Sequence, residues 1–374
     1  MWIRTLLVTL SLYLTSALVV AQTPEPSKDA DGLIHITLTL DRKAISIDYP
    51  PNLSNTDASH QQLLSGVAGT RARVGTLTAH RALRFGSLAT DPEAPLPPRE
   101  EGEPAPEPPT HELWLVRNAE GWELEAHQSD STTVNIVPLS HDESNSVEGP
   151  TFSASLHATA AEAGHLKLRW GRHAWTTAFR FDELPPPPRR PRVSGDPSEN
   201  EYDTDTSAFT RRVTLDERNE STVVLPDGNQ IATLYWKDID VDGEDYGRLQ
   251  DTEHEAIVSL IHAPPLRIRS DVNLKFGDVD VPVGNLAAGF AGSYALWLQK
   301  TDSGWGFVFN NEPDSWGTQH DPEFDAAEFD VQYARTTDSF RPLGIALVLA
   351  SETTGSIIVH WGPHEWSAPF SVAR

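Results

Sequence analysis

The stretch that decides the fold is written twice in this chain of 374 residues. Residues 164–179, GHLKLRWGRHAWTTAF, align without a gap with residues 355–370, GSIIVHWGPHEWSAPF. Three more pairs follow the same order along the chain: LWLVRNAEGW (113–122) with LWLQKTDSGW (296–305), LRFG (83–86) with LKFG (274–277), and ISIDY (45–49) with IATLY (231–235). Matches in a fixed order indicate an internal duplication. We therefore predict two tandem homologous units, at residues 32–184 and 209–374.

The apolar residues of both units recur with a period of two. Ile34, Ile36, Leu38 and Leu40 alternate with polar residues, which is typical of a strand with one buried face. PDGN at residues 226–229 lies between two such rows and predicts a hairpin turn. No window of 11 or more residues has the pattern of an amphipathic helix. The predicted class is all-β, with each unit an antiparallel β-sandwich.

Two segments have compositions that cannot form a core. Residues 185–208 are rich in proline and then acidic, which predicts a semi-rigid linker between the two units. Residues 91–109 are rich in proline and glutamate and interrupt the first unit, where we expect a disordered surface loop.

The N-terminus and the composition predict an exported protein, periplasmic or extracellular. Residues 1–21 combine Arg4, an apolar run and small residues before Gln22, as in a signal peptide. No later run is long enough for a transmembrane helix. The chain has no cysteine, which excludes disulfides and thiolate sites, and its net charge of −25 argues against nucleic acid as a partner.

Several motifs of the second unit resemble a known family. They are GDVDV (277–281), YALW (294–297), GWGFVFN (304–310) and WGTQHD (316–321), followed by Asp325. This pattern is similar to the bacterial exported family called domain of unknown function 2911. The resemblance implies an all-β exported domain and implies no activity. The first unit lacks the WGTQHD block and is interpreted as a divergent copy.

The WGTQHD block is the main candidate for a ligand site. Trp316 could stack against a sugar ring while Gln319, His320, Asp321 and Asp325 form hydrogen bonds, or His320 and Asp321 could bind a metal ion. The alternative is structural: a loop whose tryptophan closes one end of the sandwich and whose polar groups satisfy the loop backbone.

A second candidate is the acidic segment DIDVDGED at residues 238–245. Asp238, Asp240 and Asp242 have the spacing of the first three ligands of a calcium loop, with Glu244 following. The position of the final bidentate glutamate is taken by Leu249. We expect no cofactor, with calcium as the one candidate, because a partial loop of this kind in a very acidic protein is often only a solvated turn.

The duplicated hexapeptides WGRHAW and WGPHEW are interpreted as a fold signature. Four tryptophans are expected to pack in the core: Trp170, Trp175, Trp361 and Trp366. The histidines between them, His173 and His364, are then residues of a hairpin tip. Motifs of zinc hydrolases, serine hydrolases and nucleotide-binding proteins are absent.

The function that these observations favour is a non-catalytic binding or structural module with an unidentified ligand. Carbohydrate and another envelope protein are the two partner classes considered, and the oligomeric state is left open. One alternative is a hydrolase or metal-dependent enzyme that uses His320, Asp321 and Asp325. The other is a calcium-dependent surface or adhesion module.

Overall fold

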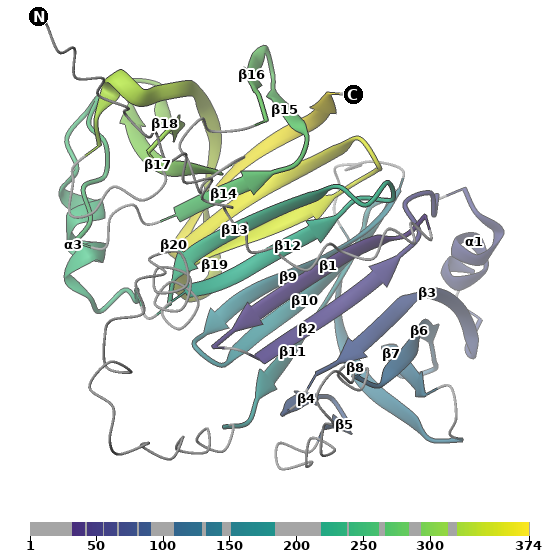
Figure 1. The fold of residues 1–374 in the computed structure, drawn as a ribbon. Coiled ribbons are helices and arrows are strands. Elements are labelled where there is room, and N and C mark those ends of the chain that lie inside the picture. Colours follow the sequence, from purple (N-terminus) through teal and green to yellow (C-terminus); the bar gives the residue numbers. More distant parts are fainter. Residues whose placement is uncertain are drawn as a thin grey trace, which may run out of the picture.

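The computed structural model describes residues 32–41, 43–54, 56–65, 67–80, 82–90, 108–128, 132–143, 151–183, 218–237, 239–261, 266–283, 293–312 and 320–373 (Figure 1). The predicted signal peptide and linker lie outside these residues, as does nearly all of the loop predicted over 91–109. What is described is almost entirely antiparallel β-structure, so the predicted all-β class is confirmed.

The first half of the chain contains one short helix and a series of strands. They are β1 (Ile34–Leu40), β2 (Lys43–Tyr49), α1 (Ala58–Leu64), β3 (Thr70–Ala79), β4 (Leu83–Phe85), β5 (Leu88–Ala89), β6 (Thr110–Arg117), β7 (Trp122–Gln128), β8 (Val134–Glu143), β9 (Phe152–Ala160), β10 (Ala163–Trp170) and β11 (His173–Phe181).

The second half repeats this order. Its elements are β12 (Arg218–Val224), β13 (Gln230–Trp236), α3 (Glu244–Asp251), β14 (Leu266–Ser270), β15 (Asn273–Phe276), β16 (Val279–Val281), β17 (Ser293–Thr301), β18 (Gly304–Asn310), the 3₁₀ turn η2 (Pro322–Phe324), β19 (Asp325–Leu349) and β20 (Thr354–Ala373). The predicted turn at 226–229 joins β12 to β13, with Gly228 at a φ of +84°.

The two halves share one antiparallel sheet. Its strands run in the order β8–β7–β6–β3–β2–β1–β12–β13–β14–β17–β18–β19. At the junction, Thr37 of β1 pairs with Thr222 of β12. Thr37 also pairs with Ser46, and Thr222 pairs with Ala232, the residue that aligns with Ser46. Equivalent residues therefore face each other, so the halves are related by an approximate twofold axis through this ladder.

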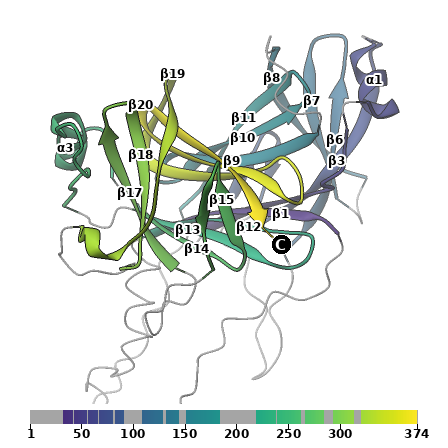
Figure 2. The ribbon, with the colours of Figure 1, turned by 90° about the horizontal axis from the view of Figure 1, so that it is seen from above.

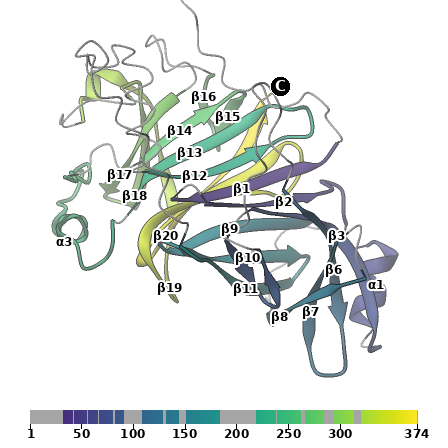
Figure 3. The ribbon, with the colours of Figure 1, turned by 60° about the horizontal axis from the view of Figure 1, so that its bottom comes forward.

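A second layer packs over one face of this sheet (Figures 2 and 3). In the first half it contains β9, β10, β11, β4 and β5, and in the second half it contains the later part of β19, then β20, β15 and β16. β20 turns back on itself at Gly362, whose φ of +57° matches the +61° of Gly171 between β10 and β11. The alternating residues of β1 and β2, buried on one face only, belong to the core between the layers.

The second layer is also continuous across the two halves, because β9 lies beside β19. Tyr49 Oη donates to the backbone oxygen of Leu349 over 3.2 Å, and the His360 ring bonds through Nε2 to the backbone oxygen of Ala158 over 2.9 Å. His157 lies 5.8 Å from His360 between ring centroids. Each half thus contributes one buried histidine to the boundary between them.

The tryptophans of the two hexapeptides are buried in the core, with exposures of 0% for Trp170, 1% for Trp175 and 0% for both Trp361 and Trp366. Each half surrounds them with the same arrangement of rings. In the second half His364 stacks on Trp366 at 5.6 Å, Tyr333 stacks on His364 at 5.8 Å, and Tyr246 of α3 meets Trp361 edge-on at 5.3 Å.

In the first half histidines replace the tyrosines. His173 stacks on Trp175 at 5.9 Å, His141 stacks on His173 at 5.3 Å, and His60 of α1 lies 4.6 Å from Trp170. The short helices α1 and α3 thus cover equivalent clusters, and they lie at opposite ends of the molecule (Figures 1 and 2). None of the helices among the described residues is long and apolar enough to cross a membrane.

We predict that removing one of these rings is costly. Trp366→Ala should lower the free energy of unfolding by about 3–5 kcal/mol, because a large side chain with no exposed surface leaves a cavity. Tyr333→Ala, at the 42% exposed end of the same stack, should cost under about 1 kcal/mol. Chemical denaturation of both variants measures the difference, and equal losses would contradict the buried role of Trp366.

We also predict that acid weakens the boundary between the halves. Burial lowers the pKa of His360 to about 3 and holds that of His157 well below its usual value. The neutral form of each ring stabilises the folded protein. This contribution is complete above about pH 6.5 and is lost as the pH falls below that value, for His360 down to about pH 3. Between pH 7 and pH 5 His360 should remove roughly 2 kcal/mol from the free energy of unfolding, and His157 should act in the same direction.

Denaturation of His360→Gln across the same pH range provides the measurement. Glutamine can donate to Ala158 without titrating, so the pH-dependent loss should shrink by roughly 2 kcal/mol. His254→Gln, at an exposed histidine, is the matched control and should keep the wild-type slope. An unchanged slope in His360→Gln would show that this ring does not remain neutral in the folded protein.

Candidate functional site

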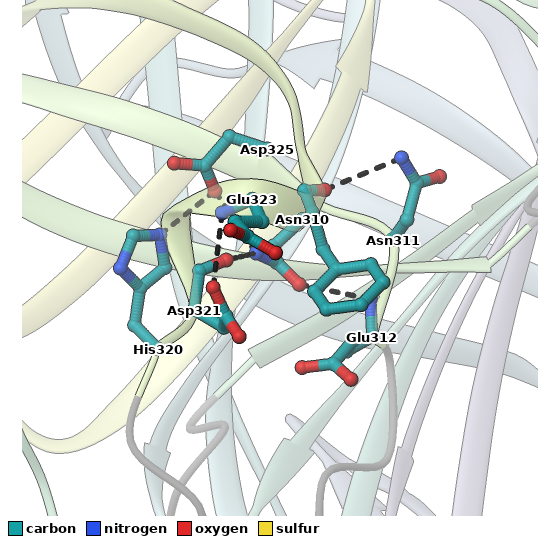
Figure 4. Close-up of polar contacts among 8 residues, drawn as sticks. Asn310, Asn311, Glu312, His320, Asp321, Glu323 and Asp325 are labelled. Carbon is teal, nitrogen blue, oxygen red and sulfur yellow. Dashed lines mark hydrogen bonds and ion pairs between the residues drawn. The ribbon is translucent and has the colours of Figure 1, made fainter.

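The WGTQHD block lies in the connection between β18 and β19. Trp316 and Gln319 fall outside the described residues, so the predicted stacking platform is not placed. His320, Asp321 and Asp325 are described, and they lie beside the end of β18 (Figure 4).

Asn310, the last residue of β18, holds this connection in place. Its Nδ2 donates to the backbone oxygen of Asp321 over 2.8 Å and to Oδ1 of Asp325 over 2.9 Å. Its Oδ1 accepts from the backbone nitrogen of Glu312 over 2.8 Å. His320 bonds through Nε2 to the same Oδ1 of Asp325 over 2.7 Å. The carboxylate of Asp325 therefore connects the imidazole of His320 to Asn310 at the end of β18.

Asp321 has a backbone role. Its Oδ1 accepts from the backbone nitrogen of Glu323 over 3.0 Å and caps the turn η2. This is the usual role of aspartate before a helical turn, where a free backbone N–H needs an acceptor. The side chain of Asn311 closes the same turn by donating to Phe324 over 3.3 Å.

The imidazole of His320 also covers an apolar patch. Its ring meets Trp297 of β17 edge-on, with 5.7 Å between centroids. Trp297 is 2% exposed and packs with Ala295, Val308 and Ile257 on the face of the sheet that points away from the core. The His320 side chain is 12% exposed. His320 thus covers an apolar patch on the outer face of the sheet.

The described residues of the block have few of the contacts that a catalytic site needs. An imidazole held by a carboxylate is the orienting half of a hydrolytic triad, but a nucleophile must also bond to the other ring nitrogen. Within the ranges that the structure describes, no hydroxyl bonds to that nitrogen. The contacts that are present connect β17, β18 and η2 to one another, which is a bracing arrangement.

The acidic segment forms a turn that leads into α3. Asp238 lies outside the described residues. Oδ1 of Asp240 accepts from the backbone nitrogen of Val241 over 2.5 Å, and Glu244 pairs with Arg248 over 3.1 Å on the exposed face of the helix. In the described part of the chain no three His, Cys, Asp or Glu side chains are grouped so as to hold a metal ion.

The sequence reasoning missed Asn310 and Trp297. Asn310 ends the GWGFVFN block, so its position at the end of a strand was visible, but its bonds to Asp321 and Asp325 were not. Trp297 belongs to the repeated block at 113–122 and 296–305, and its counterpart is Trp114. In the sequence this tryptophan stands between two leucines that belong to the core. The sequence therefore did not show that its ring points to the face of the sheet opposite the core.

Comparison with known proteins supports the resemblance for part of the chain. Residues 273–370 match the model of a family described as a protein of unknown function, DUF2911. The match begins at β15 and ends within β20, so it lies within the second half and leaves out β12 to β14. The chain matches no curated protein and no solved structure.

Proposed function

We propose that this is an exported, non-catalytic binding or structural protein built from two copies of one β-sandwich unit. The observation that carries the proposal is the internal use of the polar groups in the WGTQHD block. Asp325 is engaged by His320 and Asn310, and Asp321 caps η2. These side chains hydrogen-bond to one another and to the loop backbone at the end of β18. They therefore stabilise the loop and are not arranged around a substrate atom.

The two-copy organisation has support in both sequence and pairing. The four repeated sequence blocks occupy strands with the same neighbours, and the halves meet through equivalent residues of β1 and β12. The units proposed are residues 32–184 and 209–374, joined by the segment 185–208. Export is supported by the signal-like residues 1–21.

Substitution of His320 tests the non-catalytic reading. His320→Ala should lower the free energy of unfolding by about 1–3 kcal/mol, because Asp325 loses a partner and Trp297 loses its cover. His254→Ala, at an exposed histidine, should change it by less than about 0.5 kcal/mol.

The same variants are assayed with ester, peptide and glycoside substrates. Wild-type protein should turn over none of them. If wild-type protein hydrolyses a substrate and His320→Ala abolishes that activity while His254→Ala does not, the protein is an enzyme and the proposal is wrong.

The calcium-dependent alternative predicts a different result. A ligand bound only by the folded state must raise stability, by about 2.7 kcal/mol at a concentration 100 times its Kd. Glu244 is engaged with Arg248, and Asp240 accepts from its own turn. We therefore expect the same unfolding midpoint in millimolar calcium and in chelator. A clear rise with calcium that Asp242→Asn removes would favour the adhesion module.

A further inference from the structure

One tryptophan position of the sheet has very different surroundings in the two halves. Trp114 of β6 and Trp297 of β17 occupy the same place in the repeated blocks at 113–122 and 296–305. Each follows a leucine of the core, Leu113 or Leu296, which is 0% exposed. Since neighbours on a strand point to opposite faces, both indoles lie on the outer face of the sheet.

The second half buries its tryptophan. Trp297 pairs with Val308 across the sheet, and Ala295 lies two residues before it on the same face. The chain between α3 and β14 runs alongside β17, where Ile257 forms a bridge with Gln299 and Val258 donates to Leu298 over 2.9 Å. This segment and His320 cover the indole.

The first half leaves its tryptophan partly exposed. The equivalents of Ala295 and Val308 are Glu112 and Glu125, so the apolar neighbours have become carboxylates. The chain from α1 to β3 is only residues 65–69, whereas 252–265 connect α3 to β14. Among the described residues, Arg71 lies over the Trp114 ring and His127 meets it edge-on.

The charges around Trp114 balance one another. Arg73 pairs with Glu112 over 3.3 Å. Glu125 bonds to Nε2 of His127 over 2.8 Å, and Arg71 approaches the same carboxylate over 3.8 Å. The guanidinium of Arg71 lies 4.9 Å above the centre of the Trp114 ring, and its side chain is 54% exposed. An exposed ion pair of this kind contributes little to stability, so Arg71 is free to move aside.

We propose that this face binds an uncharged carbohydrate. A pyranose ring takes the place of the Arg71 guanidinium over the indole of Trp114, with its C–H groups against the electron-rich ring face. Arg73 donates to sugar hydroxyls, and Glu112 and Glu125 accept from them. The inference rests on the proposed binding function and gives it a site and a ligand class.

The surroundings favour a neutral polyhydroxylated ligand over other partners. Two arginines and two glutamates have no net charge, so the patch does not select an ion. Nucleic acid would be repelled by a chain of net charge −25. A protein partner would need several apolar anchors, whereas this patch offers one indole surrounded by charged groups.

The test uses the full-length protein on insoluble cellulose, chitin and amylose, followed by calorimetry with oligosaccharides of the polymer that retains it. Wild-type protein should be retained by at least one polymer. Trp114→Ala should weaken that binding at least about tenfold, and Trp114→Phe should weaken it less. Tyr333→Ala, at an exposed aromatic residue of the other half, is the matched control and should bind as wild type.

Thermal unfolding confirms that the variants are folded, because Trp114 is outside the core and its loss should leave the midpoint almost unchanged. Retention by none of the three polymers overturns the inference, as does equal binding by wild-type protein and Trp114→Ala. Hydrolysis of a retained polymer would overturn the proposed non-catalytic function and leave the carbohydrate site standing, so the two failures are distinguishable.

Discussion

The antiparallel ladder between β1 and β12 is the interaction on which the rest of the structure depends. Each half alone would present an unpaired strand at this edge, with free backbone N–H and C=O groups. The ladder removes both edges at once and aligns the cores of the two halves. The chain has no cysteine, so this alignment rests on backbone hydrogen bonds, on apolar burial and on side-chain bonds between the halves such as those of Tyr49 and His360. The packing of β9 beside β19, and the burial of His157 and His360, follow from it.

Much of the fold could be predicted from the sequence because the information is local. The alternation from Ile34 to Leu40 identifies a half-buried strand, and the turn at 226–229 identifies a hairpin. The pairing of β1 with β12 could not be predicted in this way, because it joins Thr37 to Thr222 across the whole first half. The alternating pattern of a strand indicates which of its faces is buried, but it does not indicate which distant strand pairs with it.

The same distinction applies to the candidate site. His320, Asp321 and Asp325 are close in sequence, so their proximity was expected, and two of them do bond to each other. The role of the group was open, because it depends on Asn310 and Trp297, which come from other strands. The positions of Asn310 and Trp297 in the folded chain show whether these side chains stabilise a loop or form a site that a substrate could enter.

The two halves show how one framework can carry different surfaces. The core tryptophans and the leucines beside Trp114 and Trp297 are retained, because both halves must bury the same inner face. The outer face is not constrained in this way. In the second half His320 and the segment after α3 cover Trp297. In the described part of the first half Arg71 and His127 contact Trp114, and carboxylates stand in place of the apolar neighbours. His320 thus acts as a cover for one indole. The half without that cover is where an unburied ring, with its balanced charges, remains available to a ligand.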